Sequence, residues 1–507
     1  MRFEYLQERG WPVQAWLAEC HPDHVVIRHG RRVETRDDWF CEAVWDGPFD
    51  RGDFDLTDIV AGSGGRLRDG RAVFVPTGST TDRLHSILLP AASGRRRGRV
   101  LVSNSLPCLL AAAGTGVVPT YRQYRQDIRS IIKGLERYKK SLPTPVGPVR
   151  LWYFHNVAWD GQELGLVEKP QPQRDFSAFE PYHTFLRRSL GAVTQNAADD
   201  ARELPIGLIG TMSSGYDSTT VTTLGREFGL TDFITFDEAR GGDPDSGLEA
   251  GRHLGLRPIV VRRDAWRRST DPLPEVPFFS ADGNAEDRFF LGAAEHLRGK
   301  LMLTGFHGDK IWSKSPYSRD SLLPHPEIKR GDCSGLTMTE YRLSAGFINC
   351  PVPFWGARQI HEVVAISRDA SMRPWDVPGD YSRPICRRIV EGAGVPREAF
   401  GVAKRAGSLT ERALTDASRR DYLGWVKRHG IEGELLDRCI RKGMTVVPDP
   451  IRGKLFHMFY SWRTPSFRDY FFPWALERRT EVYRGAASPQ KAAHRRETAG
   501  ELIGAGA

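Results

Sequence analysis

The alternation of hydrophobic and polar positions is clearest between positions 206 and 229. An apolar run, Ile206 to Ile209, is short enough for a buried parallel strand. A turn of small residues follows, from Thr211 to Gly215. Beyond it, Val221 and Leu224 recur at helical spacing before Gly229, a residue type that often ends helices. The pattern predicts a strand, a tight turn and a helix.

The same rhythm continues along the C-terminal half. Further strands are expected at 233–236, 258–261 and 301–304, and helices at 179–198 and 245–254. Strands that alternate with helices predict an α/β fold, with a doubly wound parallel sheet that binds ligands at the carboxyl ends of its strands.

The N-terminal segment carries shorter β-like runs that turn signals separate, at 25–27, 73–75, 87–89 and 100–102. A mainly β or αββα domain is expected there. A basic helix is predicted at 121–140, with a solvated face as the simpler interpretation of its charge. The Pro-rich segment Lys169 to Gln173 is expected to link the two domains.

Composition adds limits to this picture. The 507 residues are too many for one core. Domains are therefore predicted at 1–172 and 173–480, with an Ala/Gly/Arg/Lys-rich disordered tail at 481–507. Hydrophobic residues make up 40% and charged residues 27%, as in soluble globular proteins. No run approaches a membrane span, and the seven cysteines contain no CxxC pair, so a cytoplasmic protein without a disulfide framework is expected.

The net charge of +9 would permit nucleic-acid binding. The basic residues are dispersed, however, and solubility explains them at least as well. We expect small-molecule partners, with neither nucleic acid nor membrane, and leave a homodimer open.

The turn before the helix has the chemistry of an anion site. Free backbone N–H groups and the dipole at a helix N-terminus favour an anion, and small residues let a polyphosphate approach. Asp217 lies inside this turn, where its carboxylate would repel a phosphate unless a cation such as Mg²⁺ lay between them.

The segment Ser213 to Ser218 resembles the Ser-Gly-Gly-x-Asp-Ser loop of the PP-loop ATP pyrophosphatases, which cut ATP between its α and β phosphates and adenylate a substrate. The resemblance implies that Ser213, Ser214, Gly215 and Ser218 hold pyrophosphate. Ser214 departs from the family pattern, which has glycine there. An ordinary serine-rich turn is the alternative. Family members place adenine against the next strand, so Phe236 is a candidate base contact, and a plain core residue is equally open.

A second strand and turn, Leu301 to Trp312, carries Asp309 between glycine-flanked positions. It resembles the Gly-x-Gly-x-Asp signature of asparagine synthetases and β-lactam synthetases, with Gly305 beside the nucleotide. The resemblance implies that Asp217 and Asp309 together hold Mg²⁺ on the β- and γ-phosphates of ATP. A turn residue that caps the next helix is the alternative for Asp309 alone.

Three further positions are candidates for catalysis. Glu340 lies 31 positions after Asp309, where β-lactam synthetases carry a Glu that pairs with a Tyr. Phe306 stands at the position of that Tyr and cannot exchange a proton. His307 beside it is a candidate base, or a plain turn residue. The stretch 375–404 is similar to the end of the family's domain, which implies that Lys404 stabilises the charge of the reacting adenylate, with a surface lysine as the alternative.

The N-terminal segment resembles, in layout, the glutaminase domain of class II amidotransferases. That activity needs a cysteine directly after the initiator Met, and position 2 is Arg, so glutamine hydrolysis is not expected.

The resemblance, over about 175–475, implies an ATP- and Mg²⁺-dependent ligase of the asparagine synthetase type. It would adenylate a carboxylate and form an amide or lactam with ammonia or a substrate amine, in specialised or cell-surface biosynthesis. The alternatives are an inactive nucleotide-binding member, a nucleotide- or tRNA-modifying PP-loop enzyme, and a purely structural protein.

Overall fold

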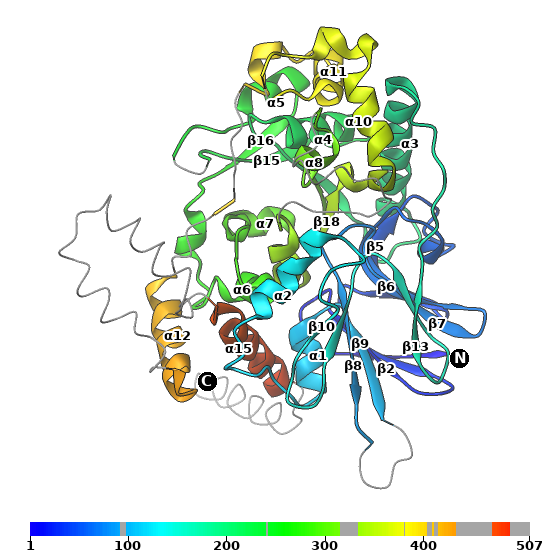
Figure 1. Cartoon of the computed structure of the whole chain (residues 1–507), viewed down its shortest axis with the longest axis vertical. Helices are drawn as coiled ribbons and strands as arrows, with labels where there is room; N and C mark the ends of the chain where they lie inside the picture. The colour runs from blue at the N-terminus through cyan, green and yellow to red at the C-terminus, as the bar shows by residue number, and fades with distance from the viewer. Residues whose placement is uncertain are drawn as a thin grey trace, which may run out of the picture.

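The computed structural model describes residues 1–91, 98–239, 242–314, 333–379, 381–402, 408–409, 414–431 and 469–486. Three β-sheets organise this part of the chain: two antiparallel-rich sheets in the N-terminal region and one parallel sheet in the C-terminal region. In Figure 1 the N-terminal sheets are blue and cyan, and the parallel sheet lies above them in green. Over the described residues no helix is both long and apolar enough to cross a membrane.

The first N-terminal sheet has seven strands in the order β1-β3-β2-β9-β8-β11-β10. Its strands are β1 (Phe3–Gln7), β2 (Trp16–Cys20), β3 (Val25–His29), β8 (Leu84–Leu89), β9 (Arg99–Ser103), β10 (Ser141–Leu142) and β11 (Val149–Trp152). Only the β1–β3 pair is parallel among the pairings of these strands. The four β-like runs expected from the sequence, one of which falls in the second sheet, all lie within strands.

The second sheet has six strands in the order β13-β12-β7-β6-β5-β4 and is antiparallel throughout. Its strands are β4 (Glu34–Thr35), β5 (Trp39–Trp45), β6 (Val60–Arg68), β7 (Arg71–Val75), β12 (Asn156–Trp159) and β13 (Leu164–Val167). One hydrophobic cluster takes Trp16 and Val102 from the first sheet and Phe40 and Phe74 from the second. The two sheets therefore face each other across a shared core.

The C-terminal sheet has five parallel strands in the order β16-β15-β14-β17-β18. They are β14 (Gly207–Thr211), β15 (Asp232–Phe236), β16 (Arg257–Val261), β17 (Lys300–Thr304) and β18 (Ile348–Pro351). Helices α4 (Tyr216–Arg226) and α5 (Leu248–Leu254) connect the first three. Leu301 and Leu303 of β17 belong to one hydrophobic cluster and Met302 to another, so both faces of the sheet are buried. The prediction of an α/β fold with a parallel sheet is confirmed.

Other helices surround these sheets: α1 (Leu106–Ala112), α3 (Phe179–Ala197), α6 (Val276–Asp282), α7 (Ala294–Leu297), α8 (Gly308–Ile311), α9 (Thr339–Ala345), α10 (Ile360–Arg368), α11 (Pro384–Gly392), α12 (Asp416–Arg428) and α15 (Phe471–Ala486). In Figure 1, α3, α4, α10 and α11 gather around the parallel sheet, whereas α15 lies back against α1 and α6.

Two predictions of secondary structure are wrong. The basic helix expected at 121–140 is only α2 (Tyr124–Arg129) followed by a short 3-10 turn, Ser130–Lys133. It stops there because Gly134 adopts a φ of +95°, which a right-handed helix cannot continue. The predicted start of the disordered tail at 481 is too early, because α15 continues to Ala486 and buries Tyr483. Residues 487–507 lie outside the described residues, and the domain boundary near 172 stays a prediction.

A buried ion network joins the N-terminal sheets to the C-terminal region. Arg342, on α9, donates to Glu42 of β5 at 2.8 Å and also pairs with Asp82. The side chains of Arg342 and Glu42 are 3% and 0% exposed, so water cannot replace either partner. This contact fixes how the two regions sit against each other.

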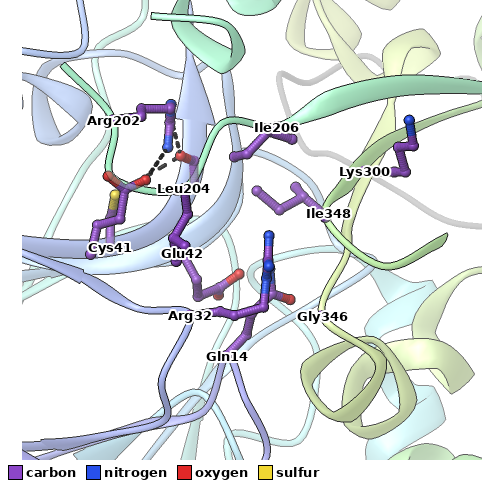
Figure 2. A pocket seen from close by; sticks show the side chains of 13 residues that line it. Gln14, Arg32, Cys41, Glu42, Arg202, Leu204, Ile206, Lys300, Gly346 and Ile348 are labelled. Atoms are coloured by element: carbon purple, nitrogen blue, oxygen red, sulfur yellow. Dashed lines mark hydrogen bonds and ion pairs between the residues drawn. The ribbon is translucent and has the colours of Figure 1, made fainter. Parts of the chain in front are cut away.

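A small cavity lies at the same boundary, at the amino ends of the parallel strands. Its walls include Gln14 and Glu42 from the N-terminal region and Ile206, Lys300 and Ile348 from the parallel sheet (Figure 2). Its volume of about 10 Å³ gives room for about one water molecule. A nucleotide therefore cannot bind there.

Candidate nucleotide site

The central strand of the parallel sheet marks the place where the order of strands changes. The chain leaves β14 toward β15 on one side, and later returns to form β17 on the other side. In open α/β sheets this arrangement leaves a crevice at the carboxyl ends of the two diverging strands, and ligands bind in it. Asp217 and Asp309 lie in the first turns of the helices that follow β14 and β17, which are α4 and α8.

Close packing holds these two turns together. A Cβ atom built on Gly308 would lie 2.6 Å from Cγ of Asp217, and one on Gly305 would lie 2.4 Å from the backbone N of Ser218. Real side chains never approach so closely, so only glycine fits at either position. The structure therefore brings Asp217 into direct contact with the turn that carries Asp309.

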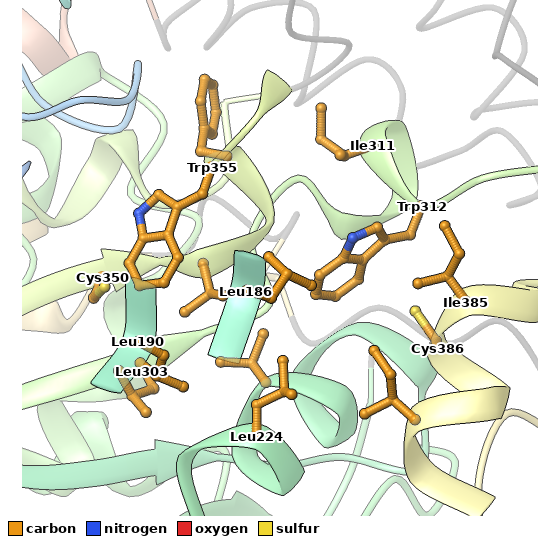
Figure 3. Packing of buried hydrophobic residues seen from close by; sticks show 14 of the residues in the cluster. Leu186, Leu190, Leu224, Leu303, Ile311, Trp312, Cys350, Trp355, Ile385 and Cys386 are labelled. Carbon is orange, nitrogen blue, oxygen red and sulfur yellow. The ribbon is translucent and has the colours of Figure 1, made fainter. Parts of the chain in front are cut away.

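One hydrophobic cluster joins the elements that carry the two aspartates and Arg383. Leu224 of α4 and Leu303 of β17 pack in it with Leu186 of α3, and Ile311 and Ile385 belong to the same cluster (Figure 3). Ile311 ends α8, which begins at Gly308, and Ile385 lies in α11. The backbones that carry the two aspartates are thereby fixed by a shared core.

Arg383, directly before α11, links the two turns. Its Nε lies 3.4 Å from Oδ1 of Asp217, and its Nη1 donates to the carbonyl of Gly308 at 3.2 Å. Burial lowers the pKa of Arg383, but the charges of Asp217, Cys386 and Asp309 outweigh that effect and raise it overall. Asp217 thus contacts this guanidinium directly, whereas Asp309 acts on it only through its charge. Asp309 also pairs with Lys310, at 2.9 Å.

These two carboxylates suit a hard divalent cation. Mg²⁺ in nucleotide enzymes takes one or two carboxylates and completes its shell with phosphate oxygens and water. No group of three or more His, Cys, Asp or Glu side chains arranged for a metal occurs in the described ranges. Asp217 and Asp309, each about one-fifth exposed, are two carboxylates that could take part in such a shell.

The serine loop lies at the N-terminus of α4, and its donors have partners within the chain. The N–H of Ser213 donates to Oγ of Ser218 at 3.2 Å, and the N–H of Gly215 donates to Oγ of Ser213 at 3.1 Å. Ser214 has a negative φ, so the serine in place of the family's glycine causes no backbone strain. Ser213, Ser214, Gly215 and Ser218 are all half-buried.

Asp245 is a site residue that the sequence analysis missed. Its Oδ1 accepts from the hydroxyl of Ser214 at 2.6 Å and from the N–H of Ser214 at 3.2 Å. Asp245 precedes α5, at the same carboxyl edge of the sheet. That position is the signal that could have identified it, because the helices after parallel strands begin at this edge.

Phe236 ends β15 and packs edge-on against Phe289 and Phe290, with ring centroids 4.7 and 5.4 Å away. An open pocket of about 180 Å³ begins at Asp237, the residue after Phe236. Its walls include Asp237, Glu238, Arg262, Arg263, Trp266 and Arg267. The contacts of Phe236 favour a core role, and its role as a base contact stays a prediction.

The candidate bases are buried. His307 is 4% exposed, has a φ of +68° and packs edge-on against Phe354 at 4.9 Å. Phe306 lies against Gly335, where a Cβ would come within 3.0 Å of its ring. Glu340 accepts from the hydroxyl of Ser105 at 2.8 Å and the N–H of Leu106 at 3.0 Å, which secures the start of α1. These contacts are structural, so the catalytic roles of His307 and Glu340 stay predictions.

Glu340 should make the stability of the protein depend on pH. Burial raises the pKa of its carboxyl to about 7, against the hydrogen bonds from Ser105 and Leu106. The contribution of Glu340 to the free energy of unfolding is therefore complete below the unfolded pKa of about 4.5. It is lost as the pH rises through 7, at a cost of about 3 kcal/mol. Glu340→Gln should flatten this dependence, measured as urea unfolding midpoints at pH 5 and pH 8. Equal pH dependence in both proteins would contradict the assignment.

Lys404 lies outside the described residues. Gly401, shortly before it, is described: its N–H donates to the carbonyl of Ser214 at 2.7 Å, and a Cβ there would lie 2.3 Å from the ring of Tyr216. The chain that leads toward Lys404 thus contacts the serine loop.

Gly308→Ala tests the contact between the two turns. The added methyl group would overlap the Asp217 side chain and displace it, and a misplacement of about 1 Å can cost about 100-fold in activity. We expect a comparable loss of Mg²⁺-dependent ATP affinity, measured by titration calorimetry. Gly392→Ala on α11, where nothing lies within 4 Å, is the matched control and should bind normally. Normal binding by Gly308→Ala would show that Asp217 does not serve the site.

No family model matches the chain, and no curated protein matches it either.

Proposed function

We propose that the protein is an ATP- and Mg²⁺-dependent ligase of the asparagine synthetase type, with a PP-loop nucleotide site. The observation that carries this proposal is the contact between the Asp217 and Asp309 turns at the point where the strand order changes. The two carboxylates supply oxygen ligands for a cation. The N-terminus of α4 and the buried Arg383 supply N–H groups that can donate to a polyphosphate.

Each residue then has a defined task. Asp217 and Asp309 would hold Mg²⁺, which when bound neutralises charge on the β- and γ-phosphates. The hydroxyls and N–H groups of Ser213, Ser214, Gly215 and Ser218 would donate to the leaving pyrophosphate. Oriented donors of this kind, which need no reorganisation during the reaction, are a main source of catalytic rate.

The chemistry comprises two steps on small-molecule substrates. A carboxylate oxygen of the first substrate attacks the α-phosphorus of ATP, the bond to the β-phosphate oxygen breaks, and pyrophosphate leaves. The nitrogen of ammonia or of a substrate amine then attacks the acyl carbon. AMP leaves with the bonding electrons, the nitrogen loses a proton to a base, and an amide or lactam results.

Substrate-dependent exchange between ATP and labelled pyrophosphate tests the first step. A panel of amino acids and sugar acids should contain at least one substrate that supports exchange, and Asp217→Ala should abolish it. If ATP binds in the presence of Mg²⁺ but no acid supports exchange, the protein is a nucleotide-binding module instead. That alternative draws support from Phe306 and from the structural contacts of Glu340.

A further inference from the structure

Asp245 occupies donors that a phosphate group would need. Its carboxylate accepts both the N–H and the hydroxyl of Ser214, in the middle of the serine loop. The neighbouring N–H groups, of Ser213 and Gly215, donate instead to serine hydroxyls. A hydroxyl can rotate and donate to an incoming anion, whereas an ionised carboxylate only accepts. The N–H groups of Ser213, Ser214 and Gly215 therefore have three acceptors, and of these the Asp245 carboxylate is the one that conflicts with a phosphate.

The segment around Asp245 is held firmly against the loop. Asp245 is 6% exposed, and the N–H of Gly247 donates to the hydroxyl of Thr235 at 2.8 Å. A Cβ on Gly247 would lie 2.4 Å from the side chain of Met212, the residue before the loop. Because these two contacts fix the backbone at Gly247, two residues after Asp245, the buried Asp245 carboxylate is presented to Ser214 in a defined position.

We propose that Asp245 is an internal competitor for the phosphate position of the serine loop. An incoming pyrophosphate group has to displace its carboxylate from the Ser214 N–H and hydroxyl, and the carboxylate returns when pyrophosphate leaves. The contact weakens pyrophosphate binding and favours release of this product. The proposal rests on the proposed function, because it assigns the loop to pyrophosphate.

The alternative role for Asp245 is to hold the loop in the shape that binds pyrophosphate. The two roles predict opposite changes in pyrophosphate affinity when the charge of Asp245 is removed. Asp245→Asn keeps an acceptor oxygen but removes the charge. A competitor predicts that this variant binds magnesium pyrophosphate about tenfold more tightly, because the charged hydrogen bond that has to be broken is weaker. A shaping residue predicts weaker binding.

The experiment is titration calorimetry of the full chain with magnesium pyrophosphate. Asp245→Ser, smaller and neutral, is the second variant if Asp245→Asn does not fold. Asp243→Asn is the control, since it removes the same charge from an exposed position in the same segment and should change affinity less than twofold. Tighter binding by Asp245→Asn or Asp245→Ser, with an unchanged control, is the result expected.

Unchanged or weaker binding by these variants, while the wild type binds, would overturn the inference and leave the proposed function standing. An equal gain in the Asp243→Asn control would also overturn it, since a general charge effect would then suffice. If neither the wild type nor any variant binds pyrophosphate or ATP with Mg²⁺, the inference and the proposed function both fail.

Discussion

Asp217→Asn should lower the rate of substrate-dependent ATP–pyrophosphate exchange by about 100- to 1000-fold, the range found when one preorganised charge-stabilising group is removed. The amide retains the size of the carboxylate but loses its charge, so the affinity for the cation falls. Asp309→Asn should have the same effect, because the turn of Asp309 packs on Asp217 and both charges act on Arg383.

Asp232→Asn is the matched control for this prediction. Asp232 begins β15 at the amino end of the same sheet, where it pairs with the exposed Arg257. Its loss removes an equal charge from the opposite edge and should leave exchange within about twofold, since exposed pairs contribute little. Loss of exchange in Asp232→Asn as well would indicate a general effect of charge rather than a site.

Arg342→Met should lower the free energy of unfolding by about 3–5 kcal/mol, because it leaves Glu42 and Asp82 as buried charges without their partner. Burial raises the pKa of Glu42, and Arg342 is the main group that counteracts this rise. Urea denaturation followed by tryptophan fluorescence measures the effect. The N-terminal sheets should loosen from α9 in the same transition.

Two further variants make this second prediction specific. Glu42→Gln combined with Arg342→Met should recover part of the loss, because one of the uncompensated charges is removed. Arg257→Met, which breaks an exposed pair with Asp232, should cost less than about 1 kcal/mol. A similarly small cost for Arg342→Met would contradict the view that this network joins the two regions.

The parallel sheet could be predicted because its signals are local, whereas the partnership of Asp217 and Asp309 was implied by the resemblance to asparagine synthetases. The apolar run at 206–209 predicts a strand. The small residues after it and the glycines around Asp309 predict tight turns. Parallel strands then place their carboxyl ends at one edge, so Asp217 and Asp309 had to lie near each other if their strands were neighbours. The structure pairs β14 with β17 directly.

The remaining features depend on contacts that are distant in sequence. Arg383 lies far along the chain from Asp217, and nothing around it indicates that it would contact both turns. Glu340 was expected near the chemistry, but its partners Ser105 and Leu106 belong to an N-terminal helix that no local pattern connects with it. The pairing of β2 with β9 is equally non-local. Such contacts are decided by tertiary packing and not by the residues adjacent in the chain.

The basic segment at 121–140 was predicted as a longer helix than the structure contains. Its charges recur as they would on a solvated helix, and composition alone favours a continuous element. Gly134, at a φ of +95°, ends that element because only glycine adopts such a backbone without strain. A glycine inside a helical pattern is therefore the feature to which the prediction gave too little weight.

The central claim is that carboxylates from two neighbouring crossovers hold one cation on a triphosphate. Crystals grown with Mn²⁺ and a non-hydrolysable ATP analogue test it directly, because Mn²⁺ replaces Mg²⁺ and gives an anomalous signal. We expect one anomalous peak within bonding distance of carboxylate oxygens from both Asp217 and Asp309, with the β- and γ-phosphates in the same coordination shell. A nucleotide bound elsewhere, or a metal that contacts neither aspartate, would contradict the account.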